Sequence, residues 1–203
     1  MVEPMGELAR YLDQILDRHT KIGSPLAQHL QPGLRIDQIR AKIADLPFKM
    51  PEEFVELYAW RNGTPASERG WISFIEFHRF LPLEEALEAF SESYPIVKHF
   101  YELSDWVMTF EDGSGDGYGI SAAKRESPSA PIVFLFQGDG VNVVFESLTQ
   151  MMKTMLAAFD AGVFSMGEAG DLATDFYKLG EVAHKLNPTT FYWKQYASYR
   201  KKV

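Results

Sequence analysis

The spacing of apolar residues changes from a helical to a strand period near residue 105, and this change constrains the fold more than any other feature. Trp106, Met108 and Phe110 lie at alternate positions, which is typical of a half-buried strand. A turn-rich EDGSGDG segment follows them. Further strands are predicted over 118–122, 131–136 and 141–145, the last two forming a hairpin around a Gln-Gly-Asp-Gly turn.

Helical spacing dominates on both sides of this region. Leu8, Leu12 and Ile15 form one apolar stripe, which predicts a helix over 5–19 with His19 at its edge. Ser147 can cap a helix that runs to about residue 160. We also expect helices over 35–45, from Pro51 to Asn62-Gly63 and over 81–86, and a strand over 70–80. After residue 169 we expect a helix, a loop at Asn187-Pro188 and an aromatic last helix.

The absence of cysteine excludes disulfides and thiolate metal sites and fits a reducing compartment. The first ten residues, MVEPMGELAR, are acidic and amphipathic, unlike a signal peptide. No apolar run approaches the roughly 18 residues that indicate a membrane span. We therefore expect a cytoplasmic protein that does not bind membranes.

The net charge of −8 is unevenly distributed along the chain. Residues 51–120 carry 14 acidic and 4 basic residues, whereas 185–203 carry 5 basic and no acidic residues. An acidic centre repels nucleic acid and attracts basic partners. The alternative is a solvated surface that only keeps the protein soluble.

Several motifs occur in an order that resembles the SMI1/KNR4 (SUKH) family. The motifs, in chain order, are MPEEFVELYAWRNG ending in Asn62-Gly63, LPLEEAL, a Trp106 strand leading to Gly115-Asp116-Gly117-Tyr118, a Pro-Ile-Val strand, and a Ser-Leu helix start. The resemblance covers about 34–160. We therefore expect one domain over 1–203, with a helical N-terminal addition over 1–33 and a helical C-terminal extension over 161–203.

This resemblance implies an α+β fold with a mostly antiparallel, curved sheet flanked by helices, and extra helices at both ends. It also implies protein–protein recognition without catalytic residues. Bacterial members are similar to immunity proteins that neutralise polymorphic toxins, and fungal members are similar to regulatory scaffolds in cell-wall synthesis. A fold alone does not fix a function, so both hypotheses stay open.

Searches for reactive sites favour structural interpretations. Ser114 is not in a G-x-S-x-G context, and no histidine is marked as its partner. Asp112, Ser114 and Asp116 match the start of a calcium loop, but position 12 would be Ala123 instead of glutamate. Asp116 is instead expected to accept backbone N–H bonds within its own turn. We expect no metal, no cofactor and no enzyme activity, although an unrecognised enzyme site stays open.

The leading hypothesis is an immunity or interaction protein that presents an acidic surface from 51–120 to a basic partner such as a toxin domain. Homo-oligomerisation also stays open, and nucleic acid is the last choice as a partner. The aromatic-basic C-terminus is expected first to pack on the domain. Candidate partner-binding residues are Trp60, Trp71, Glu76, Asp112 and Asp116, and candidate structural residues are Asn62, Gly63, Trp106, Gly115 and Asp116.

Overall fold

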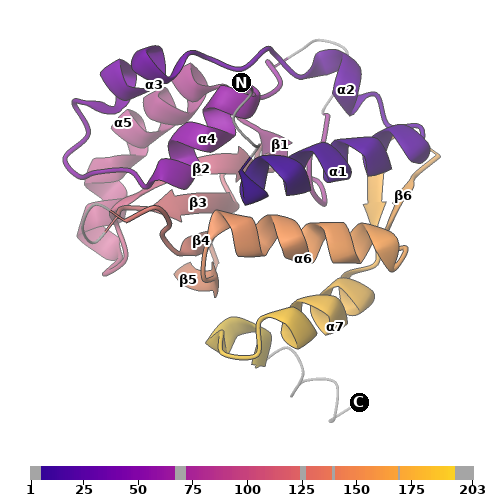
Figure 1. The fold of residues 1–203 in the computed structure, drawn as a ribbon. Coiled ribbons are helices and arrows are strands. Elements are labelled where there is room, and N and C mark those ends of the chain that lie inside the picture. The colour runs from indigo at the N-terminus through magenta and orange to yellow at the C-terminus, as the bar shows by residue number, and fades with distance from the viewer. Residues whose placement is uncertain (1–5, 67–71, 124–126, 139, 169, 195–203) are drawn as a thin grey trace.

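The computed structural model describes residues 6–66, 72–123, 127–138, 140–168 and 170–194 (Figure 1). Five strands form an open sheet in the order β1-β2-β3-β4-β5, and every neighbouring pair is antiparallel. The strands are β1 Arg79–Phe80, β2 Trp106–Glu111, β3 Gly117–Ser121, β4 Ile132–Phe136 and β5 Gly140–Phe145. The helices are α1 Glu7–Lys21, α2 Leu26–His29, α3 Ile36–Ile43, α4 Glu52–Trp60, α5 Leu83–Phe100, α6 Leu148–Asp160 and α7 Phe176–Leu186.

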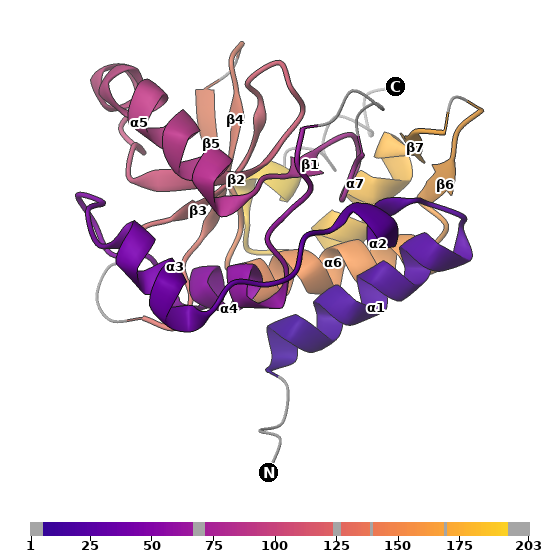
Figure 2. The ribbon, with the colours of Figure 1, turned by 90° about the horizontal axis from the view of Figure 1, so that it is seen from above.

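Helices cover both faces of the sheet, as Figure 2 shows. One face packs on α1, α4 and α6 in a large core that includes Phe110, Ile120 and Phe145. The opposite face packs under α5 in a smaller apolar cluster that contains Trp106 and Val133. The α+β fold with an antiparallel sheet and flanking helices is therefore confirmed.

Local capping chemistry explains where two of the long helices begin. Ser147 accepts the N–H of Gln150 at 3.0 Å, as expected for an N-cap serine. Glu53, from α4, accepts the N–H groups of Leu148 and Thr149, each at 3.1 Å. A carboxylate at the positive end of α6 thus fixes this helix against α4.

The Asn62-Gly63 pair is a junction between α4 and α5. Asn62 accepts the N–H of Leu83 at 2.9 Å and donates to the Gln31 side chain at 3.0 Å. Gly63 has a φ of +68°, and a Cβ there would lie 2.5 Å from the carbonyl carbon of Leu81. Only glycine therefore fits this position without moving the backbone that leads into α5.

Trp106 is a buried anchor on the α5 face of the sheet. Its indole N–H donates to the Leu103 carbonyl at 3.0 Å. A Cβ on Gly119 of the neighbouring strand would lie 2.5 Å from the Trp106 ring. The bare glycine backbone therefore gives the ring its space.

The strand expected over 70–80 is wrong for most of its described residues, since only β1 forms. The chain turns at Glu76, which has a φ of +49°, and Ile75 forms a bridge with His78. Phe74 and Ile75 are fully buried, so this apolar composition reflects core packing instead of strand pairing.

Three other predictions need correction. The helix that we expected over 81–86 extends to Phe100 and includes Pro95. His19 is fully buried instead of lying at a helix edge. A hairpin of β6 Phe164–Met166 and β7 Leu172–Thr174 precedes α7 and was not expected.

The two terminal additions pack on the family-like part of the chain. The N-terminal α1 lies beside α6, and Figure 1 shows α7 below α6. The core includes Leu12 from α1 and Leu179 from α7. Most of the expected aromatic last helix, including Tyr196 and Tyr199, lies outside the described residues, but Trp193 is buried against Phe145 at a ring distance of 5.6 Å.

Candidate functional site

Three of the residues that we selected from the sequence, Glu76, Asp112 and Asp116, line one hollow of about 380 Å³. Glu76 comes from the turn before β1, and both aspartates come from the turn between β2 and β3. We call this hollow the aromatic–acidic cleft. Its other lining residues are Phe77, Tyr118, Phe134, Phe136, Asn142, Phe176, Leu179, Gly180, Tyr192 and Trp193.

Hydrogen bonds fix the two aspartates of the cleft. Asp112 Oδ1 accepts the N–H groups of Ser114 at 2.8 Å and Asp116 at 3.2 Å. Asp116 Oδ1 accepts the N–H of Gln137 at 2.9 Å and so joins the β2–β3 turn to the β4–β5 turn. The prediction that Asp116 holds its own turn is wrong, because Asp112 has that role.

Gly115 lies between these aspartates in a conformation that favours glycine. Its φ is +97°, and a Cβ there would lie 2.3 Å from the side-chain nitrogen of Gln137. That nitrogen donates to the Ser114 carbonyl at 2.9 Å. The two turns are therefore in close contact. A larger residue at 115 would be strained by this φ and would displace the Gln137 amide.

The floor of the cleft contains a buried polar cluster. Tyr118 Oη donates to Glu76 Oε1 at 3.0 Å, and the Glu76 carboxylate lies 3.3 Å from Nδ1 of His78. Burial, reinforced by the Glu76 carboxylate, raises the pKa of Tyr118 well above its ordinary value of 10.0. Tyr118 therefore stays protonated and acts as a hydrogen-bond donor.

The histidine of this cluster is not accessible from the cleft. The His78 ring is fully buried under Phe77, Tyr118 and Phe134, so a substrate in the cleft cannot reach its nitrogens. Within the described residues, no group of three or more histidine or carboxylate side chains could hold a metal ion.

The described part of the chain also contains no helix that is long and apolar enough to cross a membrane.

Exposed aromatic rings form the rim of the cleft. Phe77, Phe136 and Phe176 expose 44%, 49% and 46% of their surface, although rings of this size are usually buried. The rings of Phe77 and Phe176 lie 5.9 Å apart. Exposed apolar side chains around a hollow mark a contact surface.

The candidate Trp60 does not join this rim. Trp60 is 9% exposed and donates its indole N–H to Asp13 at 2.8 Å, so this candidate partner-binding residue packs in the core. Trp71 lies outside the described residues. The exposed rings at the rim are the three phenylalanines, which the sequence analysis did not select.

The acidic centre of the sequence does not form one continuous surface. Arg79 is buried and pairs with Glu85 at 2.6 Å and Glu111 at 3.0 Å. Glu52 pairs with Arg40 and Glu84 with Lys42, while Glu53 and Glu76 are buried. From α5 to the start of β2, the exposed carboxylates that form no ion pair with a described residue are Glu88, Glu92, Glu102 and Asp105.

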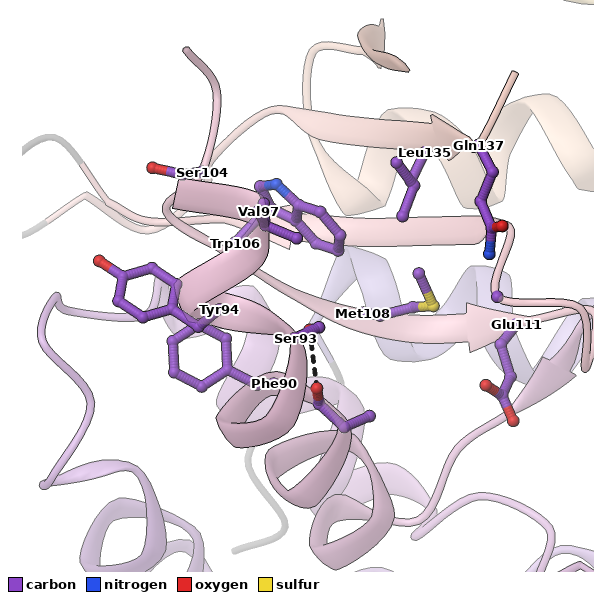
Figure 3. A pocket seen from close by; sticks show the side chains of 12 residues that line it. Phe90, Ser93, Tyr94, Val97, Ser104, Trp106, Met108, Glu111, Leu135 and Gln137 are labelled. Carbon is purple, nitrogen blue, oxygen red and sulfur yellow. Dashed lines mark hydrogen bonds between the residues drawn. The ribbon is translucent and has the colours of Figure 1, made fainter. Parts of the chain in front are cut away.

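A second hollow of about 230 Å³ lies between α5 and the sheet (Figure 3). Its walls are mainly apolar, with Phe90, Trp106 and Leu135 around it. Glu111 at its edge already pairs with Arg79. Because this hollow lacks the fixed carboxylates of the aromatic–acidic cleft, we regard the cleft as the better candidate site.

One wall of the cleft comes from the C-terminal extension. Phe176, Leu179 and Gly180 belong to α7, and Tyr192 and Trp193 follow it. The indole N–H of Trp193 donates to the Val144 carbonyl of the edge strand β5 at 2.7 Å. The extension therefore covers part of the sheet edge and completes the cleft.

Comparison with known proteins assigns the sheet and its flanking helices to a family. No curated protein matches the chain. The SMI1 / KNR4 family (SUKH-1) matches residues 33–154, which is more than half of the chain and includes the sheet and both aspartates of the cleft. The chain belongs to the SMI1/KNR4 family (SUKH-1).

Proposed function

We propose that this protein is a non-catalytic protein-binding domain of the immunity type, which neutralises a toxin domain by binding it at the aromatic–acidic cleft. The observation that carries this proposal is the combination in one hollow of exposed aromatic rims and fixed carboxylates. Aromatic anchors supply most of the binding energy at protein interfaces, and charged groups around them increase encounter rate and specificity.

Family membership supports a binding role. Proteins of the SMI1/KNR4 family are generally non-catalytic, and bacterial members resemble immunity proteins. The buried position of His78 agrees with this role, because the ring that comes nearest to a general base in the cleft is inaccessible.

The charge of the cleft supports a basic partner. Asp112 and Asp116 line the cleft, and no lysine or arginine among the described residues forms an ion pair with either. A partner with positive charge would compensate them, and such attraction weakens as salt increases.

The test is co-purification from the native host, with the wild-type chain, a Phe136→Ala/Asp116→Asn double variant and a Glu88→Gln/Glu92→Gln control. We expect the wild type and the control to retain a basic partner at low salt and the cleft variant to lose it. Expression of that partner alone should arrest growth, and co-expression of the wild-type chain should restore it.

Two results would contradict the proposal. Equal retention of the partner by the cleft variant would show that the cleft is not the binding surface. A partner without toxic activity would exclude the immunity role and favour the regulatory-scaffold hypothesis.

A further inference from the structure

One end of the aromatic–acidic cleft holds carboxylates whose positions the backbone fixes. Asp116 is held by the N–H of Gln137, and Asp112 by the N–H groups of Ser114 and Asp116. Their side chains therefore need little further ordering when a ligand binds. Asp116 Oδ1 accepts one hydrogen bond, and Oδ2 of Asp112 accepts only the Ser114 hydroxyl, so Oδ2 of each aspartate can still accept from a ligand.

Flat aromatic surfaces lie beside these carboxylates. Phe136 lines the same hollow as Asp112 and Asp116. Phe77 and Phe176 line the same hollow and are each exposed by more than 40%. The faces of such rings attract cations, most strongly where water is partly excluded.

A guanidinium group fits this combination better than an ammonium group. It is planar, can stack on a ring and can donate two parallel hydrogen bonds to a carboxylate. A lysine ammonium is a compact and more strongly hydrated charge, so its transfer into a partly apolar hollow costs more.

We propose that the cleft binds an arginine side chain of the partner, with the guanidinium at Asp112 and Asp116 and the aliphatic stem against the rim phenylalanines. This inference rests on the proposed function, because it assumes that the cleft contacts a protein. It adds the chemical identity of the group that enters the cleft.

The test is a titration of the full chain with two capped tripeptides, N-acetyl Gly-Arg-Gly amide and N-acetyl Gly-Lys-Gly amide, followed by NMR. The reporters are the backbone amide of Gln137 and the indole N–H of Trp193. We expect saturable shifts of both signals with the arginine peptide, and affinity for the lysine peptide weaker by about fivefold or more.

Asp116→Asn removes the charge but keeps an oxygen that can accept the Gln137 N–H, so the turn should stay intact. We expect this variant to bind the arginine peptide about fivefold more weakly, which is the effect of losing one partly exposed ion pair. Glu88→Gln, on the exposed surface of α5, is the matched control and should leave binding unchanged.

Three results would overturn the proposal: no saturable shift at the cleft, equal affinity for the two peptides, or equal loss in both variants. Tighter peptide binding by an Arg200→Gln/Lys201→Gln/Lys202→Gln chain would also overturn it, by identifying the chain's own C-terminus as the occupant. If the arginine peptide does not bind but Phe136→Ala still weakens binding of the native partner, the arginine inference fails while the proposed function stands.

Discussion

Acidification should destabilise this protein through His19, a buried ring that joins α1 to the segment before β1. Its Nε2 lies 2.8 Å from the Phe74 carbonyl, which can only accept, so Nε2 carries the proton. Its Nδ1 lies 3.0 Å from the Ser24 hydroxyl and therefore accepts from it. Burial lowers the pKa of His19 from 6.5 to about 4, against the opposing effect of the Phe74 carbonyl.

The sign of the effect follows from the two protonation states. Between pH 6.5 and about 4 the unfolded chain binds a proton at His19 that the folded protein does not bind, so stability falls as the pH is lowered through this window. At about 1.4 kcal/mol per pKa unit, the loss is about 2 kcal/mol at pH 5 and about 3.4 kcal/mol below pH 4.

The assay is urea unfolding of the wild type and of His19→Gln at several pH values between 8 and 5. Glutamine stays neutral and can still donate to the Phe74 carbonyl, so this variant should lose about 2 kcal/mol less than the wild type over the same pH range. Other titrating groups are common to both chains and cancel in the difference. Parallel pH profiles would refute the argument that His19 is the responsible group.

Two further substitutions test the junctions of the fold by chemical unfolding, each with a matched control. Gly63→Ala should lower the free energy of unfolding by more than about 2 kcal/mol, because backbone strain and a clash with the backbone at Pro82 add. The control Gly23→Ala, with a φ of +82° and open space around it, should cost only about 1 kcal/mol. Equal costs for the two variants would exclude the clash. Glu53→Gln should cost about 2 kcal/mol of stability because it removes the charge that caps α6. The control Glu52→Gln, at the neighbouring exposed residue, should change stability by less than about 1 kcal/mol. Similar values for the two variants would show that the cap contributes nothing.

The elements between 105 and 160 could be predicted from the sequence because local chemistry specifies them. The apolar run from Trp106 to Phe110 marks β2, although an irregularity between Met108 and Phe110 puts the Trp106 and Phe110 rings on opposite faces of the sheet. Ser147 starts α6 by accepting a backbone N–H only three residues away. These signals act within one turn or one strand. They therefore do not depend on how distant parts of the chain pack.

The errors arose where tertiary packing overrides local pattern. The apolar segment before β1 resembles a strand, but Phe74 and Ile75 are buried in the core and the chain turns at Glu76. His19 is buried because α1 packs on α6 and on the Phe74 segment, and its ring contacts Phe159 at 4.9 Å. Neither contact can be read from the local sequence.

The candidate site was only partly predictable for the same reason. The carboxylates were selected because the acidic centre and the EDGSGDG turn are visible in the sequence. The rim was missed, because Phe77, Phe136 and Phe176 lie far apart in the chain and each has an apolar pattern typical of a buried ring. Exposure, on which their proposed contact role rests, is a property of the folded surface alone.

The C-terminal extension links the stability of the sheet to the specificity of the cleft. Strand β5 is an edge of the sheet, and an uncovered edge can pair with other chains. Trp193 binds the Val144 carbonyl on this edge, and the same segment and α7 supply a wall of the cleft. Since residues 33–154 match the family and these wall residues follow them, one side of the cleft is built from shared elements and the other from elements outside the match. If the cleft binds a partner as we propose, a change in the extension should alter which partner is recognised while the carboxylate end of the cleft stays the same.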